Sequence, residues 1–225
     1  MVVSPFSWKR ARTFVAHHGL RALGKRATKM ASGGAADLTA RFMREQGVEA
    51  RSLKRWCRSH HVDYRVVSTL NNPDAVNLVK TSNADGVVYC GGGILRRAFL
   101  DAARGRVLNA HAGPLPAVRG MNACEWALLL GLRPEVTIHF IDEGIDTGPA
   151  LELIPVEVAA GDDIQTVRQK AVLAGVQGLA RHASAVTREM PLKRSMPLSR
   201  QCFVLAPALH DLLSAKLAGG GAHAW

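Results

Sequence analysis

The chain has 225 residues and a formal net charge of +11, a length that predicts one α/β domain with a single core. Its four cysteines have no short spacing between them, which excludes a CxxC metal knuckle and a dense disulfide framework and predicts a reducing, cytoplasmic location. No apolar run approaches the roughly 20 residues that a membrane-spanning helix needs, so we expect no transmembrane segment.

The positive charge is concentrated near the N-terminus. Residues 1–70 contain 14 Lys and Arg against 4 Asp and Glu, and the first acidic residue is Asp37. Three interpretations stay open: a solvated basic helix, a surface for an anionic partner such as nucleic acid, phosphate or lipid, and a transit-like presequence. We expect residues 1–60 to form a basic, mainly helical segment without a β-strand.

Hydrophobic periodicity and turn residues predict the elements along the chain. The expected helices cover residues 5–30, 37–47, 52–60, 73–80, 95–103, 121–131, 163–189 and 208–217. The expected strands cover residues 63–70, 84–90, 106–112, 135–141 and 150–158, and Pro155 marks an edge or a bulge in the last of them. Strands that alternate with helices predict a Rossmann-like, mostly parallel sheet over a core of residues 61–190, followed by a tail of residues 191–225.

The stretch VLNAHAGPLP, residues 107–116, joins an apolar strand to a proline turn. Side chains alternate between the two faces of a strand, so Asn109 and His111 point to the same side. Open parallel sheets bind their ligands at strand ends of this kind. The stretch alone is equally compatible with an ordinary histidine beside a turn.

A second informative stretch, DEGIDTG, covers residues 142–148 and directly follows the strand over residues 135–141. It places three carboxylates within five residues, between glycines that let a loop approach a ligand closely. An acid near His111 would favour the imidazolium form and fix the orientation of the ring. We expect His139, which alternates with core positions, to be a residue of the other face without a role in the site.

The stretches GGGILRRAFL, VLNAHAGPLPAVRG and VTIHFIDEGIDTG together resemble the folate-dependent formyltransferase family. This family includes glycinamide ribonucleotide transformylases, methionyl-tRNA formyltransferases and sugar or amino-acid N-formyltransferases. The resemblance covers about residues 60–190. It implies the formyltransferase fold and formyl transfer from 10-formyltetrahydrofolate, as co-substrate, to a primary amine.

The resemblance also implies roles for individual residues. Asn109 would bind the formyl oxygen and steady the oxyanion, His111 would act as general acid or base, and Asp146 would hold His111 and relay a proton through water. The positions that match the folate-binding segments are Gly92, Gly93, Ile94, Leu95, Ile141, Asp142, Glu143 and Gly144. The positions expected to contact the acceptor are Pro114, Arg119 and Gly120, although Arg119 fits an internal salt bridge equally well.

The chain departs from the family pattern at its N-terminus, where the usual first strands are not recognisable and an N-terminal truncation is one explanation. Residues 119–131, RGMNACEWALLLG, favour a small acceptor such as an amino sugar or an amino-acid derivative. Methionyl-tRNA and glycinamide ribonucleotide are the alternative acceptors, and an inactive relative that binds an anionic partner is a third hypothesis. We expect no metal site and do not favour nucleic acid as a partner, while a homodimer stays open.

Overall fold

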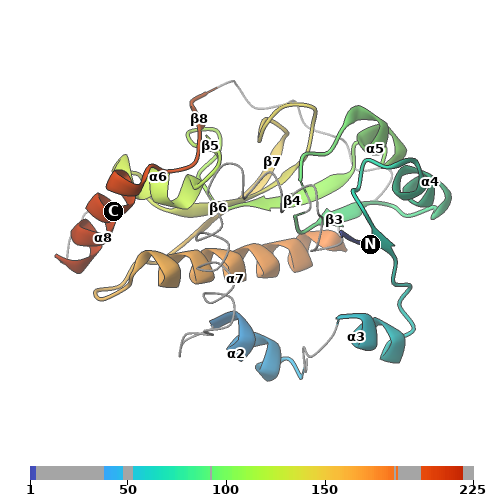
Figure 1. The fold of residues 1–225 in the computed structure, drawn as a ribbon, viewed down its shortest axis with the longest axis horizontal. Helices are drawn as coiled ribbons and strands as arrows, with labels where there is room; N and C mark the ends of the chain where they lie inside the picture. The colour runs from blue at the N-terminus through green and yellow to red at the C-terminus, as the bar shows by residue number, and fades with distance from the viewer. Residues whose placement is uncertain (4–37, 48–52, 92, 185, 187–198, 220–225) are drawn as a thin grey trace, which may run out of the picture.

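The computed structural model of the chain describes residues 1–3, 38–47, 53–91, 93–184, 186 and 199–219. The basic helix expected over residues 5–30 and the end of the helix expected over residues 163–189 lie outside these ranges. Within them the chain forms a sheet with helices on both sides (Figure 1). Among the described residues, no helix is both long enough and apolar enough to cross a membrane.

The main sheet has four strands in the order β3-β4-β6-β7. Their bounds are Val87–Tyr89, Val107–His111, Glu135–Phe140 and Ala150–Pro155. Strand β3 is parallel to β4, whereas β6 is antiparallel to both β4 and β7. The prediction of a mostly parallel sheet is therefore wrong for this four-stranded sheet, although the α/β class is right.

The antiparallel direction of β6 follows from the connection that precedes it. Residues 112–134 contain the short strand β5 (Arg119–Gly120) and helix α6 (Ala123–Leu129), and they stay at the end of the sheet without crossing one of its faces (Figure 1). Strand β6 therefore begins beside the end of β4, with Thr137 opposite His111. A parallel neighbour needs a crossover connection over the sheet, which this segment does not supply.

The two faces of the sheet have different coverings. Helix α7 (Ile164–Ala183) begins at Asp163, whose carboxylate accepts a hydrogen bond from Thr166 N at 2.7 Å, and packs along one face. Its Gly178 leaves room for the Ile138 side chain, which a Cβ at that position would meet at 2.6 Å. Alternation along β4 and β6 then directs Asn109 and His139 to the opposite face.

The remaining helices flank this sheet (Figure 1). Helices α4 and α5 contribute to a core cluster around Val107 and Phe99, while α6 and α8 pack with α7 at the other end. Helix α2 lies against α7, where Leu38 N donates to the side-chain oxygen of Gln169. The bounds are α2 Leu38–Glu45, α3 Leu53–Ser59, α4 Pro73–Thr81, α5 Arg97–Ala102 and α8 Pro207–Ala218, each within a few residues of the expected helix.

Two short strand pairs lie outside the main sheet. Strand β1 (Val2–Val3) pairs in parallel with β2 (Val66–Val67), so the prediction that the first sixty residues contain no strand is wrong. A strand of two residues shows no alternating pattern that a sequence could reveal. Strand β5 pairs in parallel with β8 (Gln201–Cys202), which brings the C-terminal segment beside the connection between β4 and β6.

Candidate functional site

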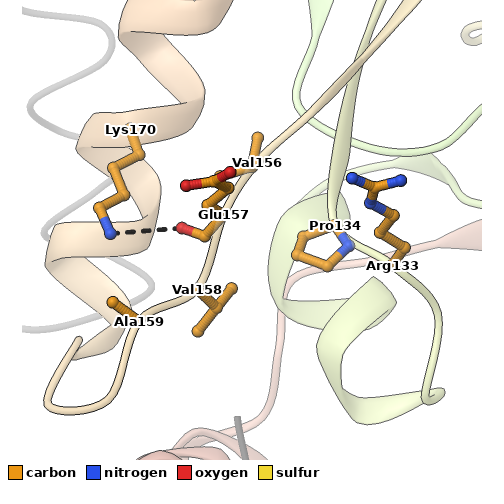
Figure 2. Close-up of a pocket in the computed structure, with 7 residues that line it drawn as sticks. All are labelled: Arg133, Pro134, Val156, Glu157, Val158, Ala159 and Lys170. Carbon is orange, nitrogen blue, oxygen red and sulfur yellow. Dashed lines mark hydrogen bonds between the residues drawn. The ribbon is translucent and has the colours of Figure 1, made fainter. Parts of the chain in front are cut away.

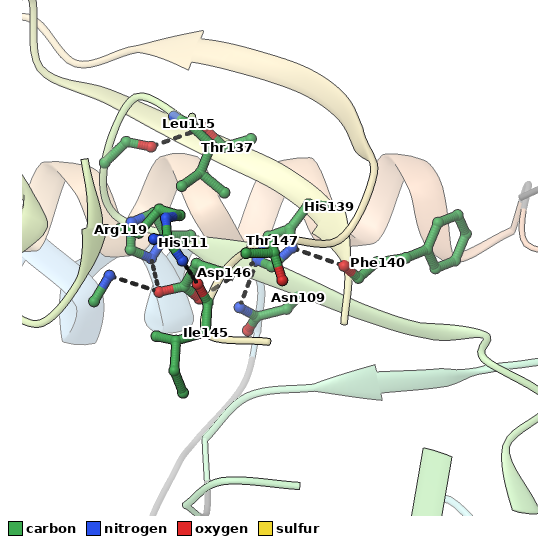
Figure 3. Close-up of polar contacts among 12 residues, drawn as sticks. Asn109, His111, Leu115, Arg119, Thr137, His139, Phe140, Ile145, Asp146 and Thr147 are labelled. Carbon is green, nitrogen blue, oxygen red and sulfur yellow. Dashed lines mark hydrogen bonds and ion pairs between the residues drawn. The ribbon is translucent and has the colours of Figure 1, made fainter. Parts of the chain in front are cut away.

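The site is built on the end of β4, where His111 and Asp146 meet. The Nδ1 atom of His111 lies 3.4 Å from Oδ2 of Asp146, and Nε2 donates to the carbonyl of Val118 at 2.9 Å (Figure 3). Because a carbonyl only accepts, Nε2 must carry a hydrogen. The ring is therefore held with Nδ1 facing the Asp146 carboxylate.

The second polar contact of the site joins β4 to β6. His139 lies directly opposite Asn109, and its Nε2 is 3.0 Å from Nδ2 of Asn109. The Nδ1 atom of His139 donates to the Phe140 carbonyl at 2.8 Å, which leaves Nε2 as an acceptor for the amide (Figure 3). Burial is the main cause that lowers the pKa of His139, and the nearby charge of His111 acts in the same direction. His139 is therefore held as a neutral acceptor.

The loop after β6 delivers Asp146 to this point. Asp142 Oδ1 accepts hydrogen bonds from Gly144 N and from the Thr147 hydroxyl, which close the loop on itself. Asp146 has a left-handed backbone with φ of +51°, and its Oδ2 accepts from Gly120 N at 2.8 Å. The carboxylate is thus fixed from both sides, between the β5 backbone and His111.

A cavity of about 430 Å³ opens beside these groups. This volume lies in the range of ordinary small-molecule sites. Asn109, His139 and Asp146 supply polar groups to its lining. The other lining residues are Tyr89, Gly93, Ile94, Leu95, Gly120, Met121, Ile141, Asp142, Gly144, Ile145, Gln201, Cys202 and Phe203. The three residues with predicted catalytic roles are therefore close together: Asn109 and Asp146 line the cavity, and His111 lies behind Asp146.

Most of the residues expected to bind folate lie at this cavity. The lining includes Gly93, Ile94, Leu95, Ile141, Asp142 and Gly144. Gly92 lies outside the described residues. Glu143 is exposed, does not belong to the lining and lies 3.3 Å from the guanidinium of Arg97. The apolar side chains of Ile94, Leu95 and Ile141, next to the backbone of Gly93, form one wall of the cavity. Such a wall suits a flat ring with polar edges.

Of the three positions expected to contact the acceptor, only Gly120 lines the cavity. Pro114 is buried outside the lining. Arg119 is also buried, and its two terminal nitrogens donate to the carbonyls of Ile145 at 2.8 Å and Ser199 at 2.6 Å. The alternative that Arg119 has an internal role agrees better with these contacts, although its partners are backbone carbonyls and not an acid.

The sequence interpretation missed two parts of the site. The prediction that His139 lies on the face opposite the core positions is right, but this face also carries Asn109 and the cavity, so His139 lines the candidate site. The segment Gln201–Phe203 was assigned to the tail and also lines the cavity. The alternation over residues 135–141 could have shown that His139 points away from the core and toward the site. No motif in the sequence indicates that residues 201–203 line the cavity.

A second cavity, of about 310 Å³, lies between the N-terminal half of α7, the segment that precedes β6 and the segment that follows β7 (Figure 2). Lys170 reaches across it to the carbonyl of Glu157 at 3.3 Å and to Asp162. None of the residues with predicted site roles lines this cavity. The cavity beside Asn109 and Asp146 is therefore the candidate active site.

Comparison with protein-family models matches residues 31–182 to the formyl transferase family, and this match spans more than half of the chain. The chain belongs to the formyl transferase family. The family predicted from the motifs around Asn109 and Asp146 is thus confirmed.

Two curated relatives come from different branches. The phosphoribosylglycinamide formyltransferase of Mycobacterium tuberculosis is 38% identical over 101 residues, which cover 41% of this chain and 47% of that protein. The methionyl-tRNA formyltransferase of Chromobacterium violaceum is 32% identical over 125 residues, which cover 55% of this chain and 41% of that protein. The chain thus spans less than half the length of either relative.

Solved structures share the fold. The formyltransferase PseJ from Anoxybacillus kamchatkensis superposes with a TM-score of 0.54 at 17% identity, over 74% of this chain and 91% of that one. The phosphoribosylglycinamide formyltransferase of Streptococcus pneumoniae superposes with a TM-score of 0.52 at 24% identity, over 59% of this chain and 79% of that one. The formyltransferase fold therefore holds for the greater part of the chain.

Proposed function

We propose that this protein transfers a formyl group from 10-formyltetrahydrofolate to a primary amine on a small substrate, an amino sugar or an amino-acid derivative. The observation that carries the proposal is that Asn109 and Asp146 line one cavity, with His111 directly behind Asp146 at 3.4 Å. A donor amide, an imidazole and a carboxylate are what an acyl transfer between two bound substrates requires, because the protein then needs only to orient them, stabilise an oxyanion and move a proton.

The folate would bind along the wall formed by Gly93, Ile94, Leu95 and Ile141. It supplies the formyl group, and the net reaction moves one proton from the amine to the departing folate nitrogen. The PseJ structure was determined in complex with tetrahydrofolate and a formamido nucleotide sugar. We extend the folate, and not that particular sugar, to this chain as part of the proposal.

In this proposal Asn109 stabilises the charge that develops on the formyl oxygen. One hydrogen of its Nδ2 is given to His139, and the other is directed to the oxyanion. His111 binds the Val118 carbonyl through Nε2, so Nδ1 is the nitrogen that exchanges a proton. Asp146 lies between Nδ1 and the cavity, and it relays that proton through water while it holds the imidazolium.

Binding of a hydrolysis-resistant 10-formyltetrahydrofolate analogue, measured by calorimetry, tests the folate part of the proposal. Ile94 lines the cavity and is 61% exposed, so Ile94→Arg fills the folate wall with little cost to folding. Val88→Arg is the matched control, because Val88 is an exposed apolar residue of β3 outside the lining. We expect binding by the wild type and by Val88→Arg, and at least about 100-fold weaker binding by Ile94→Arg. A folded wild type that does not bind the analogue contradicts the proposal.

Formyl transfer to a panel of amines tests the acceptor part. The panel contains a nucleotide-linked amino sugar, an amino-acid derivative, glycinamide ribonucleotide and methionyl-tRNA. We expect the highest kcat/KM for one of the first two and a loss of about 100-fold in kcat for Asn109→Ala, the usual size of a lost oxyanion donor. Preferred turnover of glycinamide ribonucleotide or methionyl-tRNA would assign the chain to the corresponding branch instead.

A further inference from the structure

The segment of residues 94–96 joins the glycine turn after β3 to helix α5 and forms part of the cavity wall. Both Ile94 and Leu95 line the cavity, but Leu95 is buried in the core cluster whereas Ile94 is exposed. The backbone before Ile94 is glycine, with φ of +99° at Gly93, where a Cβ would meet no atom of the described residues within 4 Å. The position of Ile94 therefore depends on the hydrogen bonds that its backbone makes.

The side-chain amide of Asn71 binds this segment at two points. Its Nδ2 donates to the Ile94 carbonyl at 2.8 Å, and its Oδ1 accepts from Arg96 N at 2.7 Å. Arg96 has an extended backbone, with φ of −101° and ψ of 162°. In an extended chain the carbonyl of one residue and the N–H two residues later point to the same side, where a parallel strand would bind them. Asn71 thus takes the place of a neighbouring strand with one side chain.

Asn71 is itself held by the turn that precedes α4. Its backbone N–H donates to the Thr69 hydroxyl at 3.3 Å, and Leu70, directly before it, is buried in the core cluster that α4 and α5 share. The next residue, Asn72, has a different task, because its Oδ1 accepts from Ala75 N at 2.7 Å and caps α4. Two neighbouring asparagines thus direct their side-chain oxygens to different elements, one to the cavity wall and the other to a helix.

Asn71 acts on the wall from behind. It does not belong to the lining of the cavity, unlike Tyr89, whose hydroxyl donates to the Gly93 carbonyl at the start of the segment. At the other end Arg96 is the N-cap residue of α5, and its side chain makes no capping hydrogen bond within the part of the chain that the structure describes. The two bonds of Asn71 therefore fix the end of the wall that leads into α5.

We propose that Asn71 is a positioning residue for the folate, because it holds the backbone of Ile94 in the place that the bound folate requires. The proposal rests on the proposed formyl transfer from 10-formyltetrahydrofolate. A wall that is ordered before binding avoids the entropy cost of ordering it in the complex, so loss of both bonds should weaken folate binding. The chemical step should be nearly unaffected, since the bonds of the Asn71 side chain go to the wall and not to the residues with proposed catalytic roles.

Calorimetry with the hydrolysis-resistant 10-formyltetrahydrofolate analogue tests this role. We expect Asn71→Ala to raise the Kd of the analogue by about 10-fold, the size of one or two hydrogen bonds replaced by water. With an amine that the wild type formylates, the KM for the folate should rise by a similar factor while kcat stays within about twofold. Asn72→Ala is the matched control: it removes the same side chain from the next position and the cap of α4, and it should leave the Kd of the analogue unchanged.

Amide hydrogen exchange at Arg96, followed by NMR, reports on the bond itself. Exchange should be faster by about fivefold or more in Asn71→Ala and unchanged in Asn72→Ala. Asn71→Asp keeps an oxygen for Arg96 N but loses the donor to the Ile94 carbonyl. Arg96 should therefore stay protected in this variant, and the Kd of the analogue should lie between those of the wild type and Asn71→Ala.

Two outcomes overturn the positioning role while folate binding by the wild type stands. The first is the same Kd of the analogue for the wild type and Asn71→Ala, or for the wild type and Asn71→Asp if Asn71→Ala does not fold. The second is equally weakened binding in Asn71→Ala and Asn72→Ala with equal losses of stability in urea unfolding, which would assign Asn71 to the stability of the turn alone. A folded wild type that does not bind the analogue instead overturns the proposed function, and the role of Asn71 with it.

Discussion

The Nε2 atom of His139 accepts a hydrogen bond from the side-chain amide of Asn109 at 3.0 Å, across two antiparallel strands. The Phe140 carbonyl fixes the tautomer of His139, because it takes the hydrogen of Nδ1 and leaves Nε2 as an acceptor. The amide nitrogen of Asn109, and not its oxygen, is therefore held beside His139. Its remaining N–H is the donor that the proposed reaction needs at the formyl oxygen.

The first prediction concerns this orientation. His139→Leu removes the acceptor for the Asn109 amide while it keeps an apolar side chain in a buried position, so we expect kcat for formyl transfer to decrease by about 10-fold or more. His139→Gln, whose carbonyl can accept from the same amide, should recover part of the loss. His182→Gln is the control, since His182 lies on α7 and binds Glu152 away from the cavity. Equal kcat for His139→Leu and the wild type would show that the orientation does not matter.

The second prediction concerns the pH dependence of stability. Burial, assisted by the charge of His111 and opposed by Asp146 and Asp142, lowers the pKa of His139 in the folded protein. The unfolded chain then binds a proton at His139 at about pH 6.5 while the folded chain does not, so the free energy of unfolding decreases as the pH falls below that value. The slope from this residue is at most about 1.4 kcal/mol per pH unit.

Urea unfolding between pH 8 and pH 5 measures this slope. The difference between the wild type and His139→Gln isolates the contribution of the buried histidine, and we expect the variant to lose less stability on acidification. His61→Asn is the control, because His61 is exposed and its left-handed backbone, with φ of +55°, suits asparagine. Parallel curves for the wild type and His139→Gln would contradict the prediction.

Local pattern was enough to predict the strand that carries Asn109 and His111, and the loop position of Asp146 next to it. These residues lie within or directly after a strand, so alternation and order along the chain fix their approximate place. To predict the contact between His139 and Asn109, the direction of strand β6 relative to β4 must also be known. Alternation places it on the face opposite Ile138, but only the antiparallel pairing of β4 with β6 puts it opposite Asn109.

The cavity wall at Phe203 depends on contacts between residues far apart in the chain. The pairing of β8 with β5 involves only Gln201 and Cys202, and it is accompanied by the hydrogen bond from Trp126 to the Phe203 carbonyl. No periodicity arises from two residues of strand. Contacts over about 80 positions follow from tertiary packing, which a single sequence does not display.

The third prediction concerns the charge of Asp146. Asp146→Asn keeps a side-chain oxygen for Gly120 N and a residue that tolerates the left-handed backbone at φ of +51°, so the loop should stay in place. It removes the negative charge 3.4 Å from His111 Nδ1. We expect kcat to decrease by about 10²- to 10⁴-fold, the usual range for a lost acid–base group. An unchanged Kd for the folate analogue is the control, and an active Asp146→Asn would remove Asp146 from the proposed mechanism.

The fourth prediction concerns the ion pair between Glu125 of α6 and Arg168 of α7, which joins the two helices behind the site. The Glu125 side chain is 4% exposed, and its Oε1 accepts from Asn122 Nδ2 at 2.8 Å and from Arg168 Nε at 2.6 Å. Arg168→Met leaves a buried carboxylate without its charged partner, which costs about 3 kcal/mol or more. Glu125→Gln should cost less, because the Arg168 side chain is 38% exposed and can turn toward water.

A double-mutant cycle measured by urea unfolding tests this pair. We expect the double variant Glu125→Leu/Arg168→Met to be more stable than Arg168→Met alone, because Glu125→Leu removes the buried carboxylate that Arg168→Met leaves unpaired. Arg97→Met is the control: Arg97 is 76% exposed and pairs with exposed acids, so its loss should change the free energy of unfolding by no more than about 1 kcal/mol. Strictly additive effects would mean that the two side chains contribute independently and that the α6–α7 contact depends on apolar packing alone.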